Sequence, residues 1–104
     1  MAMTQSPFYK TSKWKHKRAS ILRRDGYLCQ YSLRYGKRVD ADTVHHCWPL
    51  EDYPEYAYCS WNLISMSNAM HNKMHDRTTN KLTELGETLK NKTIPPTLSD
   101  KITP

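Results

Sequence analysis

Four of the five histidines lie in two close pairs, and Asn62 lies between the pairs. His45 and His46 are adjacent, whereas His71 and His75 are four positions apart. Histidine is the commonest metal ligand in proteins, and it exchanges protons readily near neutral pH. Two pairs about 25 residues apart are therefore enough to build one metal site and one general base. Asn62 alone is typical of a turn or a cap, and it gains interest only from its place between the pairs.

The second pair falls on a predicted helix that is capped by Ser67 or Asn68 and covers residues 69–77. Because they are four residues apart, His71 and His75 would lie on one face of this helix, with their Cβ atoms roughly 6 Å apart. Two imidazoles in that arrangement can share one metal ion. The alternative is a polar helix that carries two surface histidines, and the spacing alone does not exclude it.

The first pair falls near the end of a predicted strand over residues 39–47. Neighbours on a regular strand point to opposite faces, so His45 and His46 can serve one site only where the backbone turns. The segment that runs on to Pro49 predicts such a turn. One histidine would then bind a metal ion, and the other would act on a water molecule. The alternative is one buried and one exposed histidine on an ordinary strand.

Positive charge is concentrated in the first part of the chain. Residues 1–38 hold ten Lys and Arg and one acid, a net charge of +9, whereas residues 39–104 carry a net charge of −3. A basic region of this kind favours a polyanionic partner, with nucleic acid ahead of a membrane surface. The alternative is a solvated helix that only keeps the protein soluble. The charged side chains of the predicted basic helix are Lys13, Lys15, Lys17, Arg18, Arg23 and Arg24.

The 104 residues predict one small domain with a thin core, which a bound metal ion would help to stabilise. Thr11 or Ser12 can cap the basic helix, which runs to about Arg24. A strand over 39–47, a loop over 51–58, a strand over 61–64 and the helix over 69–77 follow, with a further short helix over 81–90. We expect a flexible arm at 1–10, the folded domain at 11–90 and a disordered tail at 91–104.

Three cysteines without Cys-x-x-Cys spacing, Cys29, Cys47 and Cys59, predict free thiols in a reducing compartment. No apolar run approaches the roughly 18 residues of a membrane span, and the N-terminus lacks the apolar segment of a signal peptide. We therefore expect a cytoplasmic protein with no membrane partner.

Five blocks in this order closely resemble the HNH endonuclease family, above all the small single-domain HNH proteins of bacteriophages and prophages. The blocks are Trp14 and residues 21–29, 44–50, 62–65 and 71–75, and the resemblance covers about residues 8–80. It implies an α+β fold with a ββα-metal (His-Me finger) core, in which two short antiparallel strands and a helix hold one divalent ion. The predicted strand, loop, strand and helix agree with that core, and the basic helix precedes it.

The resemblance also implies roles for the histidines and for Asn62. His46 corresponds to the general base, and His45 and His71 to metal ligands. His75 matches the second helix ligand of nuclease colicins, and Asn62 the central asparagine that braces the loop and orients the base. The implied reaction is metal-dependent hydrolysis of DNA phosphodiester bonds, in which the basic helix grips the DNA backbone. An all-imidazole ligand set favours Zn, Ni, Co or Mn over Mg.

One departure from the family concerns a structural zinc. Many phage HNH proteins hold that ion with two Cys-x-x-Cys pairs, for which this chain offers Cys29 with Ser32 and Ser67 with Met70. A zinc site needs about four good ligands, and three of the four thiolates are absent. We expect no structural zinc, with methionines and tyrosines filling the space.

Other interpretations remain open at this stage. A non-catalytic DNA-binding or packaging-accessory module could keep an HNH scaffold, and a zinc-binding interaction domain could lack a nucleic-acid partner. The resemblance implies phage terminase subunits as a partner and, for a phage-encoded protein, the host cytoplasm as its compartment. A monomer with one active site should nick DNA, whereas a dimer could cut both strands.

Overall fold

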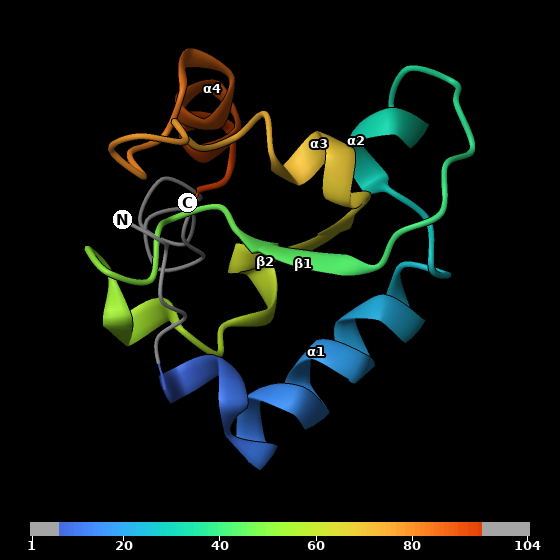
Figure 1. The fold of residues 1–104 in the computed structure, drawn as a ribbon. Helices are drawn as coiled ribbons and strands as arrows, with labels where there is room; N and C mark the ends of the chain where they lie inside the picture. Colours follow the sequence, from blue (N-terminus) through green and yellow to red (C-terminus); the bar gives the residue numbers. More distant parts are fainter. Residues whose placement is uncertain (1–6, 95–104) are drawn as a thin grey trace, which may run out of the picture.

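An antiparallel hairpin of two strands lies at the centre of the fold, with α1 on one side and α3 on the other (Figure 1). The computed structural model describes residues 7–94. Its elements, in chain order, are η1 (Pro7–Lys10), α1 (Ser12–Arg24), α2 (Gln30–Leu33), β1 (Thr43–His46), η2 (Pro54–Tyr56), η3 (Ser60–Asn62), β2 (Leu63–Met66), α3 (Asn68–His71) and α4 (Glu84–Lys92), where η denotes a 3-10 helix. The predicted α+β architecture is confirmed. Within residues 7–94, no helix is long and apolar enough to cross a bilayer.

Both sides of the hairpin are buried, because side chains alternate along each strand and each side meets a different set of helices. Pairing places Val44 opposite Ser65 and His45 opposite Ile64. The cluster on the α1 side comprises Trp14, Ile21, Leu22, Ala41, Val44 and Leu63. The cluster on the other side comprises Cys29, Cys47, Ile64, Met66, Met74 and Leu89. The two adjacent histidines of β1 consequently point into different layers.

The basic helix forms where the sequence predicts it. The Thr11 hydroxyl accepts a hydrogen bond from the Trp14 amide and so caps α1. Trp14, Ile21 and Leu22 are its buried residues. The helix ends at Arg24, and Gly26 follows its C-cap with a φ of 64°, a left-handed conformation that glycine adopts without strain.

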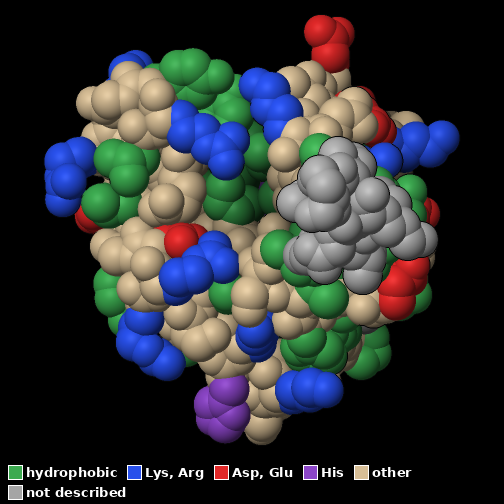
Figure 2. All heavy atoms as spheres, turned by 180° about the vertical axis from the view of Figure 1, so that it is seen from behind, with side chains coloured by type: hydrophobic (Ala, Val, Ile, Leu, Met, Phe, Trp, Pro, Cys, Tyr) green, Lys and Arg blue, Asp and Glu red, His purple; other side chains and the backbone are tan. Residues whose placement is uncertain are grey.

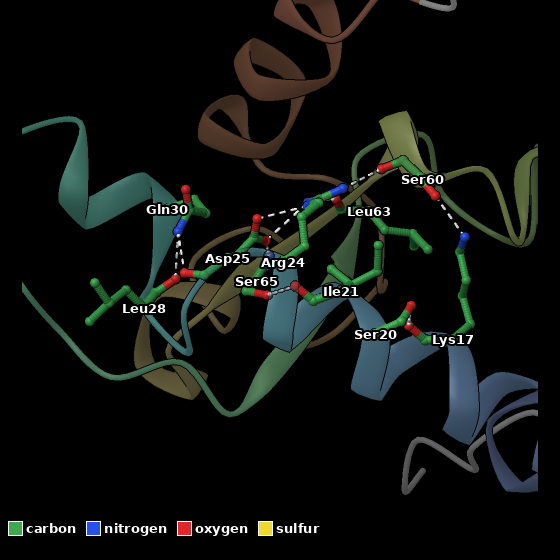
Figure 3. Close-up of polar contacts among 10 residues, drawn as sticks. All are labelled: Lys17, Ser20, Ile21, Arg24, Asp25, Leu28, Gln30, Ser60, Leu63 and Ser65. Atoms are coloured by element: carbon green, nitrogen blue, oxygen red, sulfur yellow. Dashed lines mark hydrogen bonds and ion pairs between the residues drawn. The ribbon is translucent and has the colours of Figure 1, made fainter.

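The end of α1 binds two backbone groups of β2 in place of a third strand (Figure 3). An Arg24 nitrogen donates to the Leu63 carbonyl at 2.7 Å, and the Ser65 amide donates to Asp25 Oδ2 at 3.0 Å. Arg24 and Asp25 also form an ion pair at 2.8 Å. Burial raises the pKa of Asp25, but the hydrogen bonds from Arg24 and Ser65 outweigh it and leave that pKa below its ordinary value. The pair therefore stabilises the free edge of the hairpin.

We expect Asp25→Ala to lower the free energy of unfolding at pH 7 by about 1–3 kcal/mol, because it leaves the Ser65 amide without its acceptor. A carboxyl whose pKa is lowered by folding stabilises the fold above its unfolded pKa of about 3.9, and this stabilisation is lost as the pH falls through the folded pKa. The difference in free energy of unfolding between wild type and variant should thus become smaller in acid. Urea unfolding at several pH values measures it, with Asp40→Ala as an exposed control. Equal stability of the two variants at pH 7 would contradict the assigned role.

The helix predicted over residues 69–77 is wrong beyond its first turn. α3 ends at His71, and the Met74 amide bonds to the His71 carbonyl in a tighter turn. Met74 is fully buried beneath α4, where a Cβ on Gly86 would collide with the Met74 carbonyl. The chain leaves the helix to make this contact, and His75 then pairs with Leu82. His71 and His75 do not share a helix face.

The strands also start later than predicted. β1 begins at Thr43, because Asp40 forms a bridge with Leu28 and the Ala41 amide bonds to the Tyr27 carbonyl. β2 begins at Leu63, because η3 occupies residues 60–62. α4 spans Glu84–Lys92 in place of the predicted 81–90, because the Thr83 hydroxyl caps it.

Both predicted terminal segments are partly ordered. Within the expected arm, Pro7–Lys10 forms η1, and Phe8 and Tyr9 pack against the α1-side cluster. Within the expected tail, α4 continues to Lys92, and the Thr93 carbonyl accepts a hydrogen bond from the Trp48 indole at 2.6 Å. Aromatic contacts that the sequence does not reveal account for both corrections. The remaining parts of the two predictions, 1–6 and 95–104, lie outside the described residues.

Candidate metal centre

Three histidines from three separate segments converge beside the hairpin. His45 comes from β1, His71 is the last residue of α3, and His75 lies in the loop before α4. Their ring centroids are 5.1 Å (45 to 71), 5.4 Å (45 to 75) and 5.4 Å (71 to 75) apart. One nitrogen of each ring lies within 4.8 Å of the others. Within residues 7–94, no other group of three or more His, Cys, Asp or Glu side chains meets this geometry.

His45 is the most constrained of the three. It is fully buried, and its Nδ1 and Nε2 are the only buried side-chain nitrogen or oxygen atoms in residues 7–94 that lack a hydrogen-bond partner. Burial, reinforced by His71 and His75, lowers the pKa of His45 well below its ordinary value, so the ring is neutral. A buried polar group without a partner is costly. A cation bound to a ring nitrogen would supply the missing partner.

The three side chains fit a divalent transition-metal ion. Ligand nitrogens on a tetrahedral zinc lie about 3.3 Å apart, so rings with nitrogens within 4.8 Å of one another need only small movements to reach one ion. Burial and the neighbouring His75 lower the pKa of His71 to about 4, which keeps its lone pair free near neutral pH. Metal binding requires neutral imidazole. The donor set therefore suits Zn, Ni, Co or Mn.

An open cleft of about 360 Å³ adjoins the histidines. Its lining includes two of the three rings, His71 and His75, together with Asn72, Asp76, Arg77 and Asn80. His71 and His75 therefore connect the three-histidine cluster to this cleft, whereas His45 does not line it. A larger hollow of about 480 Å³ lies on another face, where Figure 2 shows an apolar floor among Lys and Arg side chains. None of the three histidines lines it.

His46 points to the other side of β1. Its ring stacks on Trp14 with a centroid separation of 5.0 Å, and the rings of Phe8 and Tyr9 lie at 5.8 and 6.0 Å. Only 5% of the residue is exposed, and burial lowers its pKa. The predicted turn of the strand end toward one shared site is therefore not seen. Across the strand, His46 contributes to the lowered pKa of His71, after burial and His75.

The β1–β2 connection fixes the tautomer of His46. Its Nε2 lies 3.1 Å from the Ala57 carbonyl oxygen. Because a carbonyl only accepts, Nε2 must carry the proton, and Nδ1 of the neutral ring keeps a lone pair. In this tautomer the neutral ring can accept a proton only at Nδ1.

Asn62 joins the two ends of this connection. Its Oδ1 accepts from the Trp48 amide at 2.7 Å, and its Nδ2 donates to the carbonyls of Trp48 and Tyr56 at 3.1 and 3.3 Å. The side chain is fully buried. Asn62 thus holds the segment that presents the Ala57 carbonyl to His46.

The six Lys and Arg side chains of α1 differ in whether they are held by contacts within the protein. Arg24 is held by Asp25 and by the carbonyls of Ser60 and Leu63. Lys17 donates to the Ser60 hydroxyl, Arg18 donates to the Asp42 carbonyl, and Lys13 lies 4.2 Å from the centre of the Tyr58 ring. Lys15 and Arg23 are exposed. The sequence does not distinguish these cases, because the acceptors are mostly backbone carbonyls.

The four positions that correspond to the ligands of the structural zinc, Cys29, Ser32, Ser67 and Met70, lie close together. The Ser32 hydroxyl donates to Cys29 Sγ at 3.2 Å, and both Ser32 and Ser67 lower the pKa of that thiol. Met66 and Met70 pack in the same cluster as Cys29, and all three cysteines are free. Of the four positions, only Cys29 offers a thiolate.

We expect the purified chain to hold no more than one tightly bound metal ion. Zinc per chain, measured by mass spectrometry after equilibration with excess zinc and gel filtration, tests this. The combined substitutions Ser32→Cys, Ser67→Cys and Met70→Cys complete four thiolates and should add a second zinc. Two tightly bound zinc ions in the wild type would contradict the loss of the structural site.

Comparison with known proteins identifies the family. No family model and no curated protein matches the sequence. Among solved structures, the crystal structure of the HNH endonuclease from the deep-sea thermophilic bacteriophage GVE2, with manganese ion, matches with a TM-score of 0.61 and 35% sequence identity. The match covers 62% of this chain and 71% of that protein. The chain belongs to the HNH endonuclease family.

The HNH assignment agrees with the resemblance stated from the sequence, and β1, β2 and α3 form the ββα unit that it implies. Residue types and order, together with the family resemblance, point to the four histidines and Asn62 of this HNH chain as candidates. Sequence reasoning missed the two backbone carbonyls that bind histidine rings, Ala57 and Asn80. Asp76 and Asn80 are turn-forming residues that could have pointed to the second of these. No comparable signal marks Ala57.

Proposed function

We propose that this HNH chain is a metal-dependent endonuclease that hydrolyses DNA phosphodiester bonds. One observation carries the proposal: the buried, unpartnered ring of His45 converges with His71 and His75 beside an open cleft. Three imidazoles in this arrangement suit a metal ion that reaches a bound phosphate. Family membership supports the same reading.

In this mechanism His45, His71 and His75 hold one divalent ion, with Zn, Ni, Co, Mn or Mg as candidates. When bound, the ion supplies charge stabilisation to the phosphate and the leaving 3′ oxygen. His46 acts as the general base, and its Nδ1 accepts the proton of the attacking water. The Ala57 carbonyl holds the ring in the tautomer that leaves Nδ1 free, and Asn62 holds the loop that carries this carbonyl.

The basic face of α1 is the proposed DNA contact. Lys13, Lys15, Lys17, Arg18 and Arg23 would bind backbone phosphates, which gives affinity that is sensitive to salt and largely independent of sequence. Arg24 belongs to the same predicted set, but its hydrogen bonds assign it to the fold. One catalytic centre per chain favours a single-strand break. Phage or prophage origin, with terminase subunits as a partner, is part of the proposal and rests on the family resemblance.

A second candidate is a non-catalytic DNA-binding module that keeps the HNH scaffold. The packing of His46 favours it, because a ring stacked on Trp14 and 5% exposed can serve the core alone. The endonuclease should cleave DNA when a metal ion is present, whereas the non-catalytic module should bind DNA and leave it intact.

Incubation of the protein with supercoiled plasmid and each of Mg, Mn, Co, Ni and Zn tests the proposal. We expect open-circular DNA to form first with at least one of these metals and none to form after chelation. Early linear DNA would indicate paired sites in a dimer. Intact plasmid with every metal, together with retained DNA binding in a gel-shift assay, would favour the non-catalytic module.

A further inference from the structure

The segment between α3 and α4 is organised around His75. Because α3 ends at His71, helical geometry does not orient His75, and another element must do so. The loop folds back on itself through a bridge between His75 and Leu82 and a hydrogen bond from the Asp76 amide to the Lys81 carbonyl at 2.7 Å. The Thr83 amide and hydroxyl bind the Met74 and Lys73 carbonyls and tie the base of the loop to α4.

A backbone carbonyl fixes the His75 ring. His75 Nδ1 lies 3.3 Å from the Asn80 carbonyl oxygen. That oxygen only accepts, so Nδ1 carries the proton, and Nε2 of the neutral ring keeps its lone pair. A hydrogen bond of this kind to the outer nitrogen of a ligating histidine fixes its tautomer and orientation.

Two residues place this carbonyl, Asp76 through its side chain and Asn80 through its backbone. Asn80 has a φ of 62°, a left-handed conformation that asparagine tolerates and β-branched residues avoid. The Asp76 carboxylate accepts hydrogen bonds from the amides of Thr78 and Thr79 at 2.8 and 2.9 Å, and the Asn80 amide donates to the Asp76 carbonyl at 2.8 Å. The Asp76 carboxylate thus holds the start of the turn. The left-handed backbone of Asn80 ends the turn and directs its carbonyl to His75.

We propose that Asp76 and Asn80 are positioning residues that orient His75 Nε2 toward the ion shared with His45 and His71. The inference rests on the proposed function, because it assigns a purpose to the loop beside that metal site. His75 is then a full ligand, although it lies outside the helix. Asp76 and Asn80 also line the cleft and act on the ion through His75.

Metal titration of four variants tests this. Asp76→Ala removes the acceptor for two amides, and Asn80→Val disfavours the left-handed backbone. Asp76→Asn keeps an acceptor oxygen, and Asn80→Gly keeps the backbone conformation, so these two are matched controls. We expect Co²⁺ affinity to fall about 10–100-fold in the first two variants and to stay close to wild type in the controls. The visible spectrum of bound Co²⁺ should change with the affinity, because it reports ligand number and geometry.

A double-mutant cycle separates positioning from general stability. If Asp76 acts through His75, Asp76→Ala should have no further effect on Co²⁺ affinity in a His75→Ala background. Wild-type affinity in Asp76→Ala and Asn80→Val, or an undiminished effect in the His75→Ala background, would overturn the inference. A wild type that binds no Co²⁺ would instead refute the proposed metal site itself.

Discussion

His45→Ala is expected to abolish metal binding and DNA cleavage together. The variant removes the one proposed ligand that comes from the hairpin and is fully buried. Loss of an outer-shell partner of a metal ligand costs about 10–100-fold in affinity, and loss of the ligand itself should cost more. In the wild type, an ion at 100 times its Kd should stabilise the fold by about 2.7 kcal/mol, and the variant should lose this gain. Thermal unfolding with and without Co²⁺ or Zn²⁺ measures the difference.

His16→Ala is the matched control, because His16 is exposed on α1 and lies outside the site. It should keep the metal-induced shift and the nicking rate of the wild type. A His45→Ala protein that retains the metal-induced rise in Tm would contradict the assignment of His45. Equal loss in both variants would point to a general effect of removing histidines.

His46→Ala is expected to slow metal-dependent cleavage by about 10²–10⁴-fold, the usual contribution of a general base. Metal affinity should persist, because the His46 ring faces Trp14 and does not belong to the group of three proposed ligands. DNA affinity should also persist, because the proposed phosphate contacts lie on α1. Single-turnover nicking, Co²⁺ titration and fluorescence anisotropy with a labelled duplex give the three quantities.

His46→Gln separates the base from its packing role. Glutamine nearly preserves the volume and can donate to the Ala57 carbonyl as Nε2 does, but it offers no basic nitrogen. We expect this variant to be more stable than His46→Ala and equally slow. Rapid cleavage by the glutamine variant would remove His46 from the mechanism. A parallel fall in DNA binding and cleavage would show that His46 supports the fold alone.

The proximity of His45 and His71 could be predicted, because it follows from the order of the elements along the chain. A strand, a loop, a second strand and a helix bring the end of the first strand beside the helix, whichever residues mark the exact bounds. The amphipathic basic helix could also be predicted from the sequence. Its signals are local: a Thr11 cap, three apolar positions on one face and a glycine just after its end.

The position of His75 could not be predicted in the same way. Its spacing from His71 favours a shared helix face, but burial of Met74 under α4 ends the helix. This contact joins segments that are distant in sequence, and no local pattern encodes it. The two histidines still approach each other, through a turn and a carbonyl contact rather than through helical periodicity.

Arg24 shows a second limit of sequence reasoning. Its charge and its neighbours predict a DNA contact, yet its guanidinium binds Asp25 and two carbonyls of the segment that leads into β2. Backbone carbonyls have no sequence signature, so charge alone cannot separate a structural arginine from a phosphate-binding one. The same reason hides the Ala57 carbonyl that holds His46.

The most direct test of the central claim is a plasmid-nicking assay that compares wild type with His46→Ala in Mg, Mn, Co, Ni and Zn and after chelation. We predict conversion of supercoiled to open-circular DNA by the wild type only, and only with a metal present. Cleavage that survives chelation, or equal cleavage by the two proteins, would contradict the account of a histidine-held metal ion paired with His46 as base.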